Sequence, residues 1–103
     1  MKTKLKKELK WKDGTVWPMN AEVLVRVERT RPSIALVSYT GEEKKMLTEH
    51  LYVHFEEFVE VTMDMIQEAM MDGECLSMTG DTVEPDGWDS EGFPSILMAA
   101  GIM

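Results

Sequence analysis

Residues 21–29 read AEVLVRVER, and this stretch decides which class of fold we expect. Val23, Val25 and Val27 alternate with polar residues and one leucine. Successive side chains of a β-strand point to opposite faces of a sheet, so this alternation predicts a strand with one buried face. A sheet is therefore the starting point for the N-terminal part of the chain.

Turn signals on either side of this strand predict two hairpins. Residues 30–33, TRPS, form a turn that leads into a second strand at Ile34–Tyr39, which a Thr-Gly pair closes. Upstream, an Asp-Gly pair separates two short alternating runs within Leu9–Trp17, a pattern typical of a tight hairpin. Short antiparallel strands should dominate this half of the chain.

Residues 46–61 fit two periods at once. Leu47, Leu51 and Phe55 suit one face of a helix, whereas the many aromatic and β-branched residues suit strands. We predict strands at Leu51–Phe55 and Phe58–Val61 because side chains of those types pack well on a pleated sheet.

A short helix is predicted at 63–72. Thr62 suits its N-cap, Asp64 suits its first turn, and Gly73 suits a left-handed C-terminal residue. The side chains that we expect to face the sheet are Met63, Ile66, Ala69 and Met70.

The segment after Gly73 is rich in Gly and Pro and should consist mostly of turns, with Trp88 and Phe93 pinning it to the rest of the fold. Pro94 suits the first position of a terminal helix at about 94–100, which Gly101 would stop. We therefore expect an α+β fold in one domain. A small antiparallel sheet or SH3-like barrel covers residues ~4–61, and a helix with an acidic, turn-rich tail covers 62–103.

Composition narrows the class of protein further. An apolar fraction of 44% in 103 residues is typical of a chain with a hydrophobic core. No apolar run is long enough to span a membrane, and no signal-peptide pattern follows the Lys-rich start. The single cysteine, Cys75, cannot form an intrachain disulfide, so we expect a cytoplasmic protein.

Charge is divided sharply along the sequence. Residues 1–45 hold all 11 Lys and Arg and 6 acidic residues, whereas residues 46–103 hold 13 acidic residues and no Lys or Arg. The surplus acid, a formal net charge of −8, makes nucleic acid a poor direct ligand and favours a basic protein partner. The alternative is that the acid serves only solubility.

The candidates for metal sites are weak. His50 and His54 stand four residues apart, with Glu49 and Glu57 nearby, but no zinc-protease glutamate follows His50. On a strand the two imidazoles would lie too far apart, so we expect no metal there.

No other pattern indicates catalysis or a cofactor. Asp86, Asp89 and Glu91 lack the ligand spacing of a calcium loop and are typical of turns. We interpret Cys75 as a buried structural thiol. With no phosphate-binding glycine motif, we predict that the chain is not an enzyme and binds no cofactor.

The C-terminal run SILMAAGIM (95–103) and the ten methionines supply adaptable apolar surface. The run must pack on the domain, pair with a second copy, or enter a groove of a partner, and the second of these alternatives predicts a homodimer. The candidate oligomer contacts are Trp88, Phe93, Ile96, Leu97 and Ile102.

Two resemblances add expectations. Residues 9 to about 61, with tight turns and a YTGEE tip at 39–43, resemble a small SH3-like barrel in architecture alone. The tail VEPDGWDSEGFPSILMAAG (83–101) is similar to the ends of small uncharacterised proteins encoded by bacteriophages. That resemblance implies a viral protein active in the host cytoplasm, of a kind that often inhibits host machinery, including defence systems.

We therefore predict an acidic interaction protein that binds and inhibits a basic nucleic-acid-handling protein by charge complementarity. The alternative is a structural or assembly subunit that oligomerises through its apolar C-terminus. The predicted partner contacts, placed on the last strand and the helix, are Glu56, Glu57, Glu60, Asp64, Glu68 and Asp72.

Overall fold

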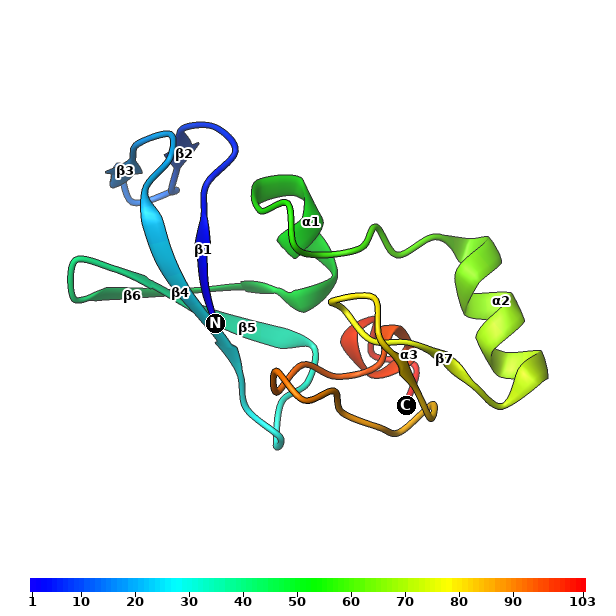
Figure 1. Cartoon of the computed structure of the whole chain (residues 1–103). Coiled ribbons are helices and arrows are strands. Elements are labelled where there is room, and N and C mark those ends of the chain that lie inside the picture. Colours follow the sequence, from blue (N-terminus) through cyan, green and yellow to red (C-terminus); the bar gives the residue numbers. More distant parts are fainter.

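Four antiparallel strands form the main sheet in the computed structural model, which describes residues 1–103 (Figure 1). Their order is β1 (Lys2–Lys4), β4 (Glu22–Val27), β5 (Ile34–Tyr39) and β6 (Glu42–Leu47). The alternation in β4 is confirmed, because all three of its valines are buried and its other side chains are exposed. The sheet is open, so the first of the two expected architectures is the observed one.

The predicted Asp-Gly hairpin is confirmed as a ribbon of β2 (Leu9–Lys10) and β3 (Val16–Trp17). Gly14 closes its turn with a φ of 91° and donates its backbone N–H to Trp11 O at 3.0 Å. Only a residue without a Cβ adopts that conformation readily, which explains the glycine.

Side chains join this ribbon to the main sheet. Trp17 is buried and donates its indole N–H to a Glu42 carboxylate oxygen at 3.1 Å. Lys44 donates to the Asp13 carboxylate. The hydrogen bond from Lys44, with those from Thr15, holds the pKa of Asp13 well below its usual range.

The strands predicted at Leu51–Phe55 and Phe58–Val61 are wrong. Thr48–His50 form a 3-10 turn and α1 spans Leu51–His54. Residues 59–62, which follow Phe58 and lead to the next helix, have no regular structure. Leu51 and Phe55 lie one helical turn apart and are both fully buried, so tertiary packing selects the helical period. The third long strand of the sheet is instead β6. Its sequence, EEKKML, is mostly charged and lacks the apolar alternation by which a strand is recognised.

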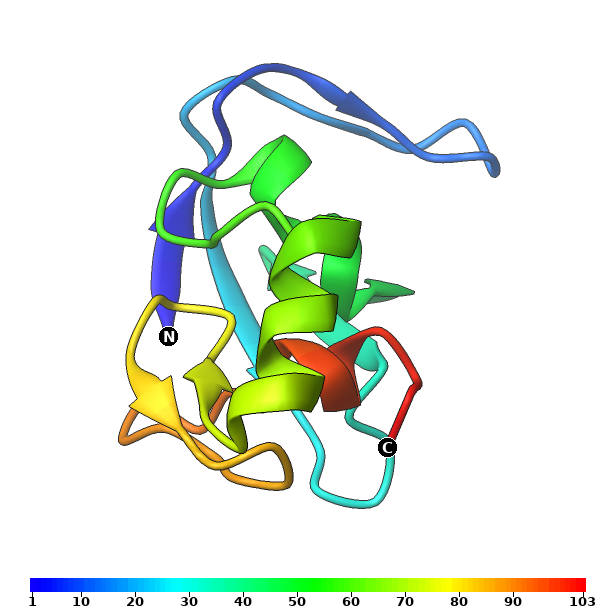
Figure 2. The same ribbon diagram turned by 90° about the vertical axis from the view of Figure 1, so that its right-hand side faces the viewer.

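The predicted helix 63–72 is confirmed as α2 (Met63–Asp72). Thr62 accepts a hydrogen bond from Met65 N at 3.2 Å, and Gly73 has a φ of 73°. Its inward face differs in part from the prediction. Ile66 and Ala69 are buried, but Met63 and Met70 are exposed, because α2 packs against the C-terminal segment and not against the main sheet (Figure 2).

The tail contains a short ribbon of β7 (Cys75–Leu76) and β8 (Thr82–Val83), and ends in α3 (Ile96–Ala99). This terminal helix begins later than predicted, since Pro94 lies before it and Ser95 is its N-cap. The Ser95 hydroxyl accepts from Met98 N at 3.2 Å and donates to Pro85 O. The predicted stop at Gly101 agrees with its positive φ.

One buried cluster of 19 residues runs from Leu5 to Ala99 and joins the sheet to the tail. Its central feature is a row of aromatic rings. Phe58 stacks edge-on against Phe55 at 6.1 Å and against Phe93 at 5.0 Å between ring centroids. No helix of the chain has the length and apolarity needed to cross a membrane.

Replacement of Phe93 should test how strongly the tail supports the fold. We expect Phe93→Ala to lower the free energy of unfolding by about 3–5 kcal/mol, because it leaves a cavity beside Phe58. Urea unfolding followed by circular dichroism would measure this loss. The control Met71→Ala, at a side chain that is 85% exposed, should change stability by no more than about 0.5 kcal/mol.

Candidate functional site

The ion pairs of the protein all lie within the first 45 residues. They join Lys2 to Glu22, Arg26 to Glu28 and Glu43, and Lys44 to Asp13 and Glu42. No carboxylate after residue 45 takes part in one, although eleven of the thirteen are exposed and only Glu49 and Asp89 are not. Five of the six acidic residues in the N-terminal part are therefore paired, all but Glu8, whereas no carboxylate of the C-terminal part has a cation within ion-pair distance.

The exposed acid is most regularly arranged on α2. Asp64, Glu68 and Asp72 are spaced four residues apart, which places them along one side of the helix. The Cβ atoms of neighbours at this spacing lie about 5–6 Å apart. We call these three residues the acidic stripe. Glu68 and Asp72 also border a groove of about 210 Å³ between α2 and the β7–β8 ribbon, together with Glu74.

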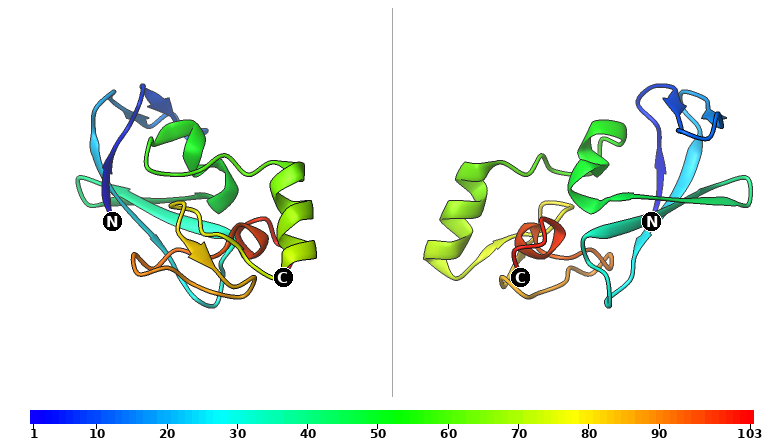
Figure 3. Two further views of the ribbon diagram at one scale, coloured as in Figure 1. Left: turned by 45° about the vertical axis from the view of Figure 1, so that its right-hand side comes forward. Right: turned by 180° about the vertical axis from the view of Figure 1, so that it is seen from behind.

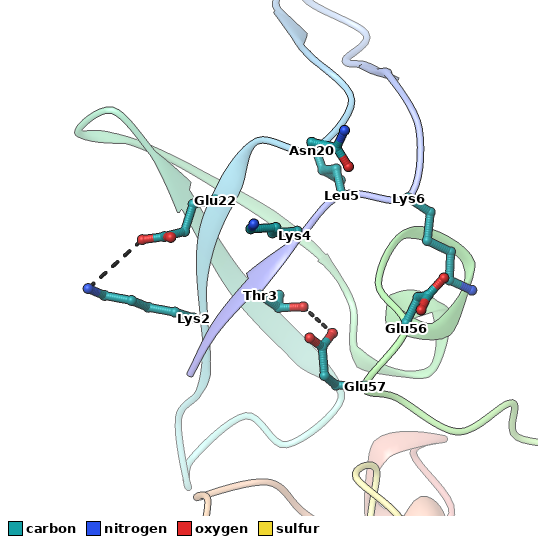
Figure 4. A pocket seen from close by; sticks show the side chains of 9 residues that line it. All are labelled: Lys2, Thr3, Lys4, Leu5, Lys6, Asn20, Glu22, Glu56 and Glu57. Carbon is teal, nitrogen blue, oxygen red and sulfur yellow. Dashed lines mark hydrogen bonds and ion pairs between the residues drawn. The ribbon is translucent and has the colours of Figure 1, made fainter.

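A different environment surrounds Glu56 and Glu57. They line a groove of about 490 Å³ beside β1, together with Lys2, Lys4 and Lys6 (Figure 4). The buried Thr3 hydroxyl donates to the Glu57 carboxylate, which fixes that side chain against the strand. Lysines and glutamates therefore line the same groove, although no lysine forms an ion pair with Glu56 or Glu57.

The six predicted contacts do not form one face. Glu56 and Glu57 follow α1, Glu60 stands in the segment that leads to α2, and only the acidic stripe lies on a helix. The prediction that a strand carries the first three is wrong, since no strand forms there. Figure 1 shows α1 and α2 separated by that extended segment.

The loop with Asp86, Asp89 and Glu91 is a structural turn in this fold. Asp89 is only 8% exposed, and its carboxylate accepts hydrogen bonds from two hydroxyls and two backbone amides. The hydroxyl donors are Ser77 at 2.7 Å and Thr79 at 2.6 Å. The amide donors are Glu91 N and Phe93 N, both at 2.9 Å.

These bonds decide the ionisation of Asp89. Burial alone raises the pKa of this carboxyl group, but the four hydrogen bonds outweigh burial and hold the pKa below its ordinary value of 3.8. The sequence gives no local signal for the hydroxyl partners, because Ser77 lies 12 residues away along the chain.

The two histidines do not assemble a metal site with other side chains. No group of three or more His, Cys, Asp or Glu residues lies within reach of one metal ion. His50 is exposed and His54 is half-buried at the end of α1. Burial, followed by the charges of Lys7, His50 and Lys6, lowers the pKa of His54. Cys75 is buried, as expected for a structural thiol.

The candidate oligomer contacts fall into two groups. Phe93, Ile96 and Leu97 are at most 2% exposed and belong to the core of the chain itself, so an intact fold does not offer them to a second copy. Trp88 is half-buried beneath the Arg29 guanidinium, which lies 4.7 Å from its ring centroid. Ile102 is 46% exposed and remains available.

We expect Asp89→Asn to destabilise the protein by about 1–3 kcal/mol at neutral pH, because it removes a buried charge that four donors satisfy. The pKa of Asp89 is lower when folded, so its contribution is complete above the unfolded value of 3.8 and disappears as the pH falls through the folded pKa. Urea unfolding over a pH series should show wild type and variant converging in acid. A gap that stays constant would contradict this.

In comparisons with known proteins, no family model, no curated protein and no solved structure matches this chain. The functional argument therefore rests on the charges, exposures and contacts of its own residues.

Proposed function

We propose that the protein is a small acidic binding protein that docks on a basic protein and keeps that protein from its nucleic acid. The observation that carries the proposal is the absence of ion pairs after residue 45, in a segment with 13 carboxylates. Exposed charge that the fold does not neutralise is available to a partner.

Rigid support for the charge favours recognition over mere solubility. The acidic stripe stands on a helix that a Thr62 cap begins and Gly73 ends. In the tail, Glu84 and Asp86 flank Pro85, whose carbonyl oxygen accepts a hydrogen bond from the Ser95 hydroxyl. Carboxylates held at fixed spacing lose less freedom on binding than those on a mobile tail.

Inhibition would follow from charge complementarity. A regular row of carboxylates on α2 resembles, in the sign of its charge, part of the phosphate backbone that a nucleic-acid-binding groove accepts. Long-range attraction would speed the encounter, and salt would weaken it.

Charge reversal of the acidic stripe tests the proposal. We expect Asp64→Lys, Glu68→Lys and Asp72→Lys together to abolish capture of the partner from a bacterial lysate, as read by mass spectrometry. Folding should be almost unchanged, because these residues are exposed and make no ion pair. The largest stability cost should be the lost helix-dipole interaction of Asp64, about 0.3–1 kcal/mol.

A matched variant separates the site from total charge. Glu8→Lys, Glu22→Lys and Glu28→Lys change the net charge equally at exposed positions in the first half of the chain. Glu22 and Glu28 each lose an exposed ion pair, which costs about 0–1 kcal/mol of stability. Capture by this control should persist, weakened only to the extent that the overall field matters. Equal capture by the wild type and the stripe variant would contradict the proposed function.

A further inference from the structure

The outward side of α2 is apolar as well as acidic. Only Ile66 and Ala69 of its ten residues are buried, whereas Met63, Met70 and Met71 are 68%, 64% and 85% exposed. We call these three the methionine stripe. No other element of the chain covers this side of the helix (Figures 2 and 3).

Helical geometry places the two stripes next to each other. At 100° per residue, the acidic stripe occupies one flank of the exposed surface, and Met63 and Met70 occupy the other. Met71 projects close to the direction of Asp64 and connects them. The exposed surface of α2 is therefore itself amphipathic.

A groove extends the apolar flank. It has a volume of about 320 Å³ and lies between Met70 and the C-terminal residues Ile102 and Met103, with Leu97 and Pro85 among its other walls. Ile102 and Met103 are 46% and 59% exposed. An apolar side chain that entered this groove would remove both residues and Met70 from water.

We propose that this surface binds a basic amphipathic segment of the partner protein, with Leu, Ile or Phe side chains on the methionine stripe and in the groove. The Lys or Arg side chains of that partner segment pair with the acidic stripe. This inference rests on the proposed function and adds the kind of segment that the partner presents. The flexible thioethers of the methionines adapt to apolar side chains of different shape.

Charge selects this occupant over a second copy of the chain. A symmetric dimer built on α2 brings two acidic stripes close together, and the two segments 46–103 contain no Lys or Arg to offset them. A basic segment has the opposite effect, because it supplies the cations that the C-terminal half lacks. Helix α2 is about 15 Å long, so a partner helix of about ten residues would lie along its whole length.

Defined peptides test the inference without knowledge of the natural partner. The probe is a short fluorescein-labelled peptide of Leu and Lys in amphipathic helical order. Its control peptide carries Ser at every Leu position and has the same charge. We expect the full-length protein to bind the Leu/Lys peptide at least about tenfold more tightly than the Ser/Lys peptide, as measured by fluorescence anisotropy.

Two variants divide the surface into its parts. Met63→Gln, Met70→Gln and Ile102→Gln remove apolar surface without a change in charge, and Asp64→Asn, Glu68→Gln and Asp72→Asn remove charge alone. Each set should weaken binding of the Leu/Lys peptide at least about tenfold. Val16→Thr, Met19→Gln and Leu24→Thr form the matched control at exposed apolar positions elsewhere, and should leave binding unchanged.

The outcomes separate this inference from the proposed function. If the glutamine variant binds as the wild type does while the charge variant fails, the apolar docking surface is refuted and the acidic binding function stands. If neither variant weakens binding, both fall. Light scattering that shows a wild-type dimer, dissociated by the glutamine variant, would instead assign the surface to a second copy.

Discussion

A buried carboxylate, Asp89, holds the C-terminal part of the protein in shape. An ionised group with so little exposure is tolerated only when hydrogen bonds replace its water, and four donors do so. Two donors, Ser77 and Thr79, follow β7, and the other two are amides within the turn that Asp89 begins. A segment with few regular elements thus acquires a fixed path, and Phe93 is directed into the core.

The exposed helix depends on that fixed path. A helix of ten residues is marginal in isolation, so α2 needs a packed surface beneath it. β7 and α3 provide that surface, and both belong to the segment that Asp89 organises. Phe93 stacks edge-on against Phe58, and Phe58 stacks against Phe55. Phe55 in turn forms a β-bridge with Leu5, directly after β1, which links this segment to the main sheet. Both stripes of α2 are therefore presented by a structure that local helix propensity alone would not maintain.

The placement of the strands confines the ion pairs to the N-terminal half of the chain. Cross-strand and hairpin neighbours bring Arg26 and Lys44 to acidic residues of the same half, and no cation lies within ion-pair distance of the C-terminal carboxylates. Exposed ion pairs of this kind add little stability. Their consequence here is electrostatic, because they pair most acidic residues of the N-terminal half, so that the unpaired acid of the protein lies almost entirely in the C-terminal half.

The sequence by itself determined the elements that local patterns specify. Alternation gave β4, an Asp-Gly turn gave the β2–β3 hairpin, and a Thr cap with a terminal glycine gave α2. The acidic stripe on α2 also followed from sequence, since spacing along a helix fixes the face. Each of these features depends on residues close together in the chain.

Only the tertiary structure decided the rest. Leu51 and Phe55 satisfied both periods, and their burial against the N-terminal strand, where Leu5 bridges Phe55, selected the helix. The hydroxyl partners of Asp89 and the exposure of Met70 depend on contacts between distant segments. Such contacts leave no local pattern, because the free energy that selects them comes from packing and from hydrogen bonds made only when the whole chain has folded.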